Sequence, residues 1–203
     1  GMGEVYRADQ LEPVRRTVAL KLLHGRRLDA RHLAYFEIER QLLAQMKHPA
    51  IAQVYDAGAT PDGSPYFAME FIEGEPLVRF CEQRRLPLRE RLELFIRVCE
   101  GVQHAHQKGV IHRDLKPGNI LVSEVDGRPL PKIIDFGIAT AATRSLAAGQ
   151  AADGRERAGT PDYMSPAQAG LDAGIEVDTR SDVYSLGVLL FELLAGRRPG
   201  TGL

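Results

Sequence analysis

The sequence predicts an α+β fold, with a small antiparallel sheet near the N-terminus and a mainly helical remainder. Short runs rich in β-branched and aromatic residues, bounded by turn residues, predict the strands. Apolar residues at intervals of three and four predict the helices. The predicted strands are 16–23, 54–57 and 66–71, and the predicted helices are 30–47, 88–108 and 182–195.

Composition limits the class of protein. The chain has 203 residues, 44% of them apolar, which is enough to bury a sizeable core. The formal net charge of -1 gives no overall field that favours nucleic acid or a membrane surface as a partner. No basic and apolar leader opens the chain, and the apolar stretch Leu186–Phe191 is too short to cross a bilayer. For that reason we expect no membrane contact within this segment. Cys81 and Cys99 are expected to be buried free thiols, which favours a reducing compartment, so we expect the segment to be cytoplasmic.

The first predicted strand, 16–23, carries a lysine among apolar residues. Because side chains alternate along a strand, Ala19 and Lys21 should share one face. An ammonium group in apolar surroundings requires an anion. Lys21 is therefore a candidate anion-binding residue.

The predicted helix 30–47 should end before Pro49, because the residue before a proline is displaced from helical geometry. It offers Glu37 and Glu39 as partners for Lys21. Glu39 has apolar residues three positions before it and three and four after it, which places it on the inward face. We therefore expect Glu39 to be the partner and Glu37 to face solvent.

The strands 54–57 and 66–71 flank a turn-rich stretch, 58–65, and should complete the small sheet. In the helix 88–108, His104 and His106 are two positions apart and point to different faces, so they are not expected to bind a metal together. Gly109 should end this helix. The face expected to enter the core comprises Leu92, Phe95, Ile96, Cys99 and Val102.

The stretch 110–121 is polar, contains Pro117 and Gly118, and lies between two apolar pairs, which predicts a loop held between buried elements. Within it, the spacing of Asp114, Lys116 and Asn119 would bring a carboxylate, an ammonium and an amide to one polyanionic substrate. Such a set suits phosphoryl transfer.

A hairpin-like connection, 122–131, leads into an apolar strand that ends at Asp135 and Gly137. A carboxylate in that position is costly unless a cation compensates its charge. The following stretch, 140–159, has no periodicity and does not predict a packed element.

Several of these stretches together resemble the bacterial serine/threonine protein kinases. The matching motifs are His112-Arg113-Asp114-Leu115-Lys116-Pro117-Gly118-Asn119, Asp135-Phe136-Gly137, Val18-Ala19-Leu20-Lys21, and Gly159-Thr160-Pro161 with the residues to Pro166. The resemblance implies a bilobal kinase-like fold, with a small lobe at 1–72 and a large lobe at 73–203 that includes an activation segment at 135–167. It also implies that the family's first strand, part of its glycine loop and its final helices are absent from the chain.

The resemblance implies a role for each candidate residue. Asp114 would take the proton of the acceptor hydroxyl and Lys116 would steady the transferred phosphoryl group. Asn119 and Asp135 would hold Mg²⁺, and Lys21 would bind the phosphates of ATP while pairing with Glu39. The other nucleotide-binding residues that it implies are Gly1, Gly3, Val5, Ala19, Met69, Glu70, Ile72 and Leu121.

The implied function is therefore transfer of the γ-phosphoryl group of ATP to serine or threonine of protein substrates. The alternatives are a nucleotide-binding pseudokinase or scaffold, and a small-molecule phosphotransferase. In one respect the sequence departs from the family pattern, because Ala167 stands where the substrate-docking segment normally has a glutamate. We expect a less rigid docking platform for that reason. By the same resemblance, the stretch 110–121 corresponds to the catalytic loop of the family, and we expect Asp182 to anchor its backbone.

Overall fold

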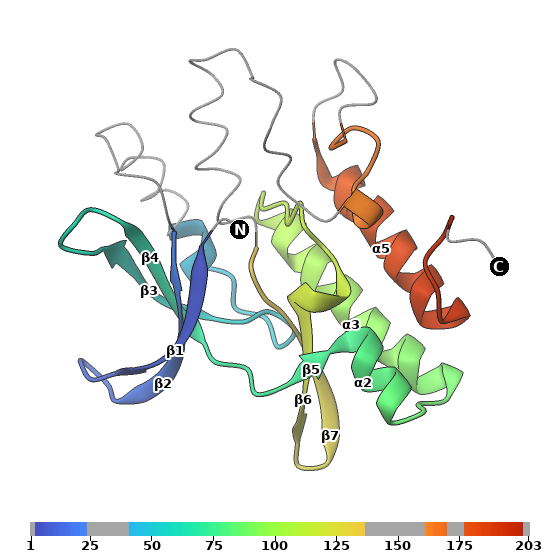
Figure 1. Ribbon diagram of the computed structural model, residues 1–203, viewed down its shortest axis with the longest axis horizontal. Helices are drawn as coiled ribbons and strands as arrows, with labels where there is room; N and C mark the ends of the chain where they lie inside the picture. Colours follow the sequence, from blue (N-terminus) through green and yellow to red (C-terminus); the bar gives the residue numbers. More distant parts are fainter. Residues whose placement is uncertain (1–2, 24–40, 137–160, 170–176, 201–203) are drawn as a thin grey trace. The chain divides into compact units, whose positions relative to one another are not determined.

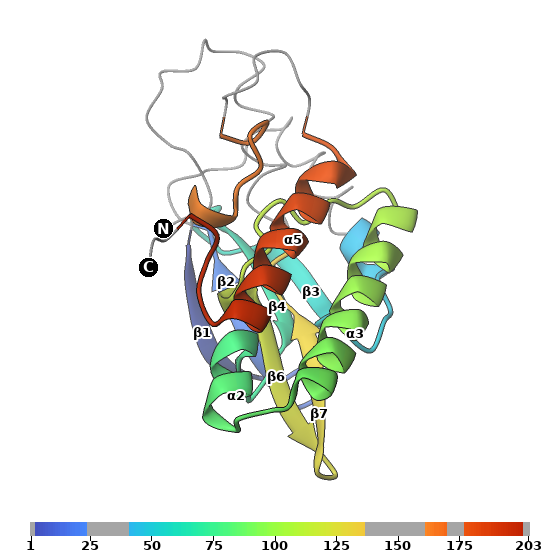
Figure 2. The ribbon, with the colours of Figure 1, turned by 90° about the vertical axis from the view of Figure 1, so that its right-hand side faces the viewer.

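The computed structural model describes residues 3–23, 41–136, 161–169 and 177–200. These residues divide into two units, which Figures 1 and 2 show from two directions. The first unit contains residues 3–23, 41–47 and 52–72, and the second contains residues 48–51, 73–136, 161–169 and 177–200.

The first unit is built on a four-stranded antiparallel sheet in the order β1-β2-β4-β3 (Figure 1). Its strands are β1 (Glu4–Gln10), β2 (Arg16–Leu22), β3 (Val54–Ala59) and β4 (Pro65–Glu70). The three predicted strands are confirmed to within two residues at each end. β1 was not predicted, because five of its seven side chains are exposed and its sequence lacks the apolar alternation that marks a half-buried strand.

The turn predicted between β3 and β4 is confirmed, and its own polar side chains hold it. The Thr60 hydroxyl donates to Asp62 over 2.6 Å and accepts from the backbone N–H of Ser64 over 3.0 Å. Gly63 has a φ of 87°, which a residue with a side chain rarely adopts. These contacts fix the register of β3 against β4.

Only the end of the predicted helix 30–47 lies within the described chain. Residues 41–44 are helical, and the N–H groups of Gln45 and Met46 donate to Leu42 and Leu43 over 3.2 Å each. The helix therefore ends at Ala44, three residues earlier than predicted, and the chain is no longer helical when it reaches the His48-Pro49 pair. Glu37 and Glu39 lie outside the described residues.

Within the described residues, the second unit combines three α-helices with the sheet β5-β6-β7, all of which are labelled in Figure 1. The helices are α2 (Leu77–Gln83), α3 (Leu88–Gln107) and α5 (Thr179–Ala195), and the strands are β5 (Glu75–Pro76), β6 (Ile120–Val125) and β7 (Arg128–Ile133). Arg91, near the start of α3, donates to the carbonyl oxygen of Leu193 near the end of α5 over 2.8 Å. His106, at the end of α3, contacts Asp182 near the start of α5. α3 and α5 therefore lie antiparallel, side by side.

The predicted core face of α3 was right only in part. Val102 is buried, Leu92, Phe95 and Cys99 are half-buried, and Ile96 is exposed. The buried residues of this helix are Leu94, Val98, Gly101, Val102 and Ala105, whereas Ile96 is 54% exposed. Both sets of apolar residues repeat at helical spacing, so periodicity alone could not choose between them. Gly101 indicates the true contact face, because a Cβ there would lie 2.9 Å from the Ile133 side chain of β7.

The connection predicted at 122–131 is a true hairpin whose strands extend further than expected. β6 and β7 turn at Asp126 and Gly127, which have φ values of 51° and 71°. Two consecutive residues with positive φ match the tight turn that suits the twist of a hairpin. The hairpin brings the loop before β6 and the segment after β7 to the same end of the sheet.

α5 begins earlier than predicted, at Thr179, and ends at Ala195 as predicted, with Gly196 as its C-cap. Its first turn is capped by Asp178, whose carboxylate accepts from the backbone N–H of Arg180 over 2.8 Å. The prediction took Asp182 as the start of the helix, but Asp182 lies in the first turn with its side chain fully buried.

Two expectations from composition can be compared with the described residues. None of their helices has the combination of length and apolarity that crossing a membrane requires. Cys81 is buried and Cys99 is half-buried, and both are free thiols.

Candidate active site

The loop between α3 and β6 carries the predicted catalytic residues and is fixed by its buried side chains. It leaves α3 at Gly109, where φ is 74°, and reaches β6 after the 3₁₀ turn η1 (Pro117–Asn119). His112 and Leu115 are fully buried. Asp114 and Lys116 alternate with these anchors, and their side chains remain 33% and 28% exposed. The anchors hold the loop while the charged residues stay accessible to a substrate.

The structure brings Asp114, Lys116 and Asn119 together, as the spacing predicts. The ammonium group of Lys116 lies 2.8 Å from Oδ2 of Asp114. The side-chain amide of Asn119 donates to the same oxygen over 2.9 Å and to the backbone carbonyl of Asp114 over 2.8 Å. The carboxylate of Asp114 is therefore oriented by two donors.

His112 is an uncharged bridge inside the second unit. Its Nε2 lies 3.0 Å from the carbonyl oxygen of Ile134, and its Nδ1 accepts from the backbone N–H of Asp114 over 3.2 Å. One donating and one accepting nitrogen define a neutral imidazole. Burial lowers the pKa of His112, against the opposing influence of nearby carboxylates. The neutral ring thus connects Asp114 to the segment that follows β7.

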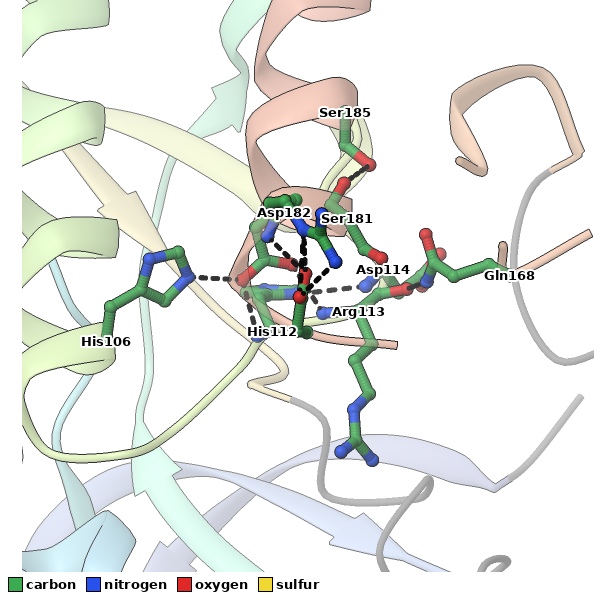
Figure 3. Close-up of polar contacts among 10 residues, drawn as sticks. His106, His112, Arg113, Asp114, Gln168, Ser181, Asp182 and Ser185 are labelled. Carbon is green, nitrogen blue, oxygen red and sulfur yellow. Dashed lines mark hydrogen bonds and ion pairs between the residues drawn. The ribbon is translucent and has the colours of Figure 1, made fainter. Parts of the chain in front are cut away.

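Asp182 anchors the catalytic loop, as the resemblance implies (Figure 3). Its Oδ2 accepts from the backbone N–H of His112 and lies near Nε2 of His106, each at 2.8 Å. Its Oδ1 accepts from the backbone N–H of Arg113 over 2.8 Å. Burial alone would raise the pKa of Asp182, but the hydrogen bonds from His106 and the two backbone groups outweigh burial and lower it. A buried carboxylate with three donors remains ionised.

Residues 161–169, here called the docking segment, are attached to α5. The hydroxyl of Tyr163 donates to the carboxylate of Glu192, and the hydroxyl of Ser185 donates to the backbone carbonyl of Tyr163 over 2.7 Å. Burial, together with Glu192, raises the pKa of Tyr163. Ser165 Oγ lies 3.1 Å from Ser181 Oγ. The expectation that Ala167 loosens this segment stays a prediction.

Asn119 and Asp135, the predicted metal ligands, lie at one end of the β6–β7 hairpin. Ile120 and Ile133 are paired across the hairpin, and the N–H of Ile134 donates to the carbonyl oxygen of Asn119 over 2.9 Å. Asp135 follows directly and has a φ of 60°, a left-handed geometry that aspartate tolerates better than most residues. A carboxylate and an amide oxygen are hard donors of the kind that Mg²⁺ prefers.

In the first unit, four of the predicted nucleotide-binding residues share one face of the sheet. Val5 lies opposite Lys21, and Ala19 lies opposite Met69. Paired residues point to the same face, and so do residues two apart along one strand. The face therefore carries Val5, Ala19, Lys21 and Met69, with Lys21 only 9% exposed.

The remaining predicted residues are placed less completely. Gly3 lies against β2, where a Cβ would collide with the carbonyl oxygen of Leu22. The backbone N–H of Glu70 donates to the carbonyl oxygen of Gln53 over 2.8 Å. The backbone group of Glu70 that is left to bond an adenine base is therefore the carbonyl oxygen of Glu70. Ile72 follows β4, and Leu121 lies in β6 opposite Lys132. Gly1 and Glu39 are outside the described residues.

Two residues near the catalytic loop were missed by sequence reasoning. His106 was considered only as a metal ligand, yet it contacts Asp182. Gln168 was not considered, yet its Nε2 donates to the backbone carbonyl of Arg113 over 2.6 Å. Neither contact has a local signal, because the partners are 76 and 55 positions apart in the sequence.

Comparison with known proteins agrees with this arrangement. A family model described as the protein kinase domain matches residues 1–202. The chain is 39% identical over 203 residues to serine/threonine-protein kinase pkn2 of Myxococcus xanthus, covering 100% of this chain and 24% of the relative. It is 40% identical over 208 residues to serine/threonine-protein kinase PknB of Mycobacterium tuberculosis, covering 100% of this chain and 32% of the relative. The chain thus spans about a quarter to a third of the length of these curated relatives.

The fold is also found in a solved structure. The crystal structure of the Mycobacterium tuberculosis PknI kinase domain matches with a TM-score of 0.71 and 30% sequence identity, over 98% of this chain and 71% of that chain. The α+β prediction is therefore confirmed at the level of the fold. These relatives bear the names of kinases and give no support to the pseudokinase alternative.

Proposed function

Since the chain belongs to the protein kinase family, we propose that it transfers the γ-phosphoryl group of ATP to serine and threonine hydroxyls of protein substrates. The observation that carries this proposal is the cluster of Asp114, Lys116 and Asn119, whose polar atoms meet within 2.9 Å at Oδ2 of Asp114. A carboxylate held in this way can orient a hydroxyl and accept its proton.

The residues of the second unit divide the work by charge. Asp114 orients the attacking hydroxyl and takes its proton. Lys116, 2.8 Å away, neutralises charge that develops on the transferred phosphoryl group. Asn119 and Asp135 are the residues that would hold Mg²⁺, which supplies charge neutralisation at the phosphates when bound. By the resemblance, Lys116 also favours serine and threonine acceptors, because kinases specific for tyrosine place other residues at this position.

The first unit supplies nucleotide binding in this proposal. Lys21 binds phosphate oxygens and is held by Glu39. Met69 guards the back of the adenine pocket, the backbone groups of Glu70 and Ile72 bond the base, and Val5 and Ala19 pack against it. The shared sheet face of Val5, Ala19, Lys21 and Met69 supports these roles, because it presents apolar contacts beside one cation. Gly1, Gly3 and, from the second unit, Leu121 complete the proposed set.

The wider assignments are also proposals. We propose a small lobe at 1–72, a large lobe at 73–203 and an activation segment at 135–167. The partners would be protein substrates and not nucleic acid, in keeping with a net charge of -1. Because the reaction uses ATP and the cysteines are free thiols, we propose a cytoplasmic site of action.

Replacing Asp114 by asparagine tests the proposal. Asp114→Asn removes the proton acceptor and keeps the shape of the side chain, so ATP affinity should stay unchanged while kcat falls about 10²- to 10⁴-fold. Phosphate transfer to a serine or threonine peptide and ATP affinity by calorimetry are the two measurements. Asp126→Asn, in the exposed hairpin turn, is the matched control and should behave as wild type. An unchanged kcat, or a loss of ATP binding equal to the loss of rate, would contradict the assignment.

A further inference from the structure

We infer that Gln168 is a positioning residue that sets the orientation of Asp114 from the docking segment; the inference rests on the proposed function. Figure 3 shows Gln168 reaching the catalytic loop beside Arg113 and Asp114. Its Nε2 donates to the carbonyl oxygen of Arg113 over 2.6 Å. That carbonyl belongs to the peptide unit that joins Arg113 to Asp114.

The peptide unit between Arg113 and Asp114 is held at both of its polar atoms. Its carbonyl accepts from Gln168 over 2.6 Å, and its N–H donates to Nδ1 of His112 over 3.2 Å. The preceding peptide unit donates its N–H to Asp182 over 2.8 Å. Rotation of the peptide plane just before Asp114 would therefore break at least one of these hydrogen bonds. Gln168 is the member of this set that comes from the docking segment.

The backbone conformation of Arg113 explains why such a clamp is needed. Arg113 has a φ of 68°, in the left-handed region that residues other than glycine seldom occupy. A residue stays in that region only when its surroundings hold it there. Without the contact from Gln168, the Arg113 carbonyl could turn toward a more favourable backbone geometry. Asp114, the next residue, would turn with it.

The orientation of the Gln168 amide is fixed by its own segment. Its Oε1 accepts from the backbone N–H of Ser165 over 3.2 Å and lies 3.2 Å from Ser165 Oγ. A flipped amide would set an NH₂ group against the N–H of Ser165 and an oxygen against the carbonyl of Arg113. The oxygen therefore organises the docking segment, and the nitrogen serves the catalytic loop.

This division separates a structural role from a positioning role. The structural role needs only the acceptor, and the positioning role needs the donor. Gln168→Glu retains the acceptor and the shape but, while ionised, sets a carboxylate against the Arg113 carbonyl. When protonated, the same side chain again offers one donor and one acceptor. The variant therefore tests the donor by means of pH.

The experiment compares wild type, Gln168→Glu and Gln103→Glu. For each protein it measures kcat, the KM for ATP and the stoichiometry of ATP binding. The measurements run from pH 8 to about pH 5.5, where a glutamate begins to protonate. Gln103 is an exposed residue of α3, so its variant controls for the added charge. At pH 8 we expect kcat of Gln168→Glu to fall about tenfold, the scale of a small misplacement, with ATP binding unchanged. At about pH 5.5 the ratio of the kcat of Gln168→Glu to that of wild type should be about threefold higher than at pH 8. Taking the ratio cancels the titration of His112, which both proteins share.

Hydrogen exchange of the peptide covering residues 110–120 provides a readout that does not depend on activity. Exchange should be faster in Gln168→Glu than in wild type or Gln103→Glu at pH 8, because the Arg113 and Asp114 amides lose support. If hydrogen exchange were the same in Gln168→Glu as in wild type, the inference about Gln168 would be overturned, whether or not the wild type transfers phosphate. If the wild type transferred no phosphate, the proposed function would be refuted instead. A loss of kcat that merely follows a loss of ATP-binding stoichiometry, or that Gln103→Glu shares, would also overturn it.

Discussion

Asp182→Asn is the substitution that most directly tests how the catalytic loop is held. The change keeps the size of the side chain and replaces one accepting oxygen by an NH₂ group. Asp182 is fully buried, and its two oxygens face three donors: the backbone N–H groups of His112 and Arg113, and His106. An asparagine cannot accept at both oxygen positions, so one backbone N–H must face an NH₂ group in either orientation.

The expected cost follows from these contacts. An unsatisfied buried N–H costs about 1 to 3 kcal/mol. Each of the other two hydrogen bonds loses its charge assistance, which is worth about 1 kcal/mol. The sum is about 3 to 5 kcal/mol, a large part of the roughly 5 to 15 kcal/mol by which a typical domain is stable. Asp182→Asn should therefore unfold at a much lower urea concentration than wild type.

Urea unfolding followed by circular dichroism provides the assay, and Asp178→Asn provides the control. Asp178 caps the same helix, α5, and its side chain is 44% exposed. Asparagine caps helices as well as aspartate does, so the control should unfold close to wild type. If Asp182→Asn and Asp178→Asn unfolded at the same urea concentration, the three hydrogen bonds at Asp182 would not be what secures the loop.

Two further predictions concern Lys21 and His112. Lys21→Met should lower ATP affinity and kcat but leave adenosine affinity unchanged, because only the phosphates lose their partner. Equal losses of affinity for ATP and adenosine would contradict this prediction. Lys108→Met, at the exposed end of α3, is the control. The folded-state pKa of His112 lies below its ordinary value of 6.5, so its stabilising contribution is complete above pH 6.5 and is lost as pH falls below it toward the folded-state value. The free energy of unfolding should decrease in that window by at most about 1.4 kcal/mol per pH unit for this one proton, and a flat profile in chemical denaturation from pH 7 to 5 would contradict the neutral assignment.

Much of the candidate site was predictable because it is local in sequence. Asp114, Lys116 and Asn119 lie within six residues, and their spacing alone indicated that their side chains would converge. The strand β2 was equally clear, since its apolar residues alternate around Lys21. Signals of this kind depend on one element and its immediate neighbours, which a single sequence displays.

What sequence could not supply depends on packing between elements. α3 has two apolar stripes, and only its contact with α5 and β7 decides that Leu94 and Val98 are buried while Ile96 is exposed. β1 was missed because pairing with β2, not burial, makes it a strand. α2 was not among the predicted helices. It has no side-chain cap at its N-terminus, so its sequence lacks the usual signal for the start of a helix.

The position of Asp114 is the clearest case of dependence on distant residues. Arg113 adopts a left-handed backbone that costs about 1 to 2 kcal/mol for a residue with a side chain. The contacts that stabilise it come from Asp182 in α5 and Gln168 in the docking segment, 69 and 55 positions away. The loop sequence alone therefore favours a different backbone, and the orientation of Asp114 depends on the contacts from α5 and the docking segment. It follows that a substitution which displaces α5 can turn the Asp114 side chain out of this orientation without contacting it.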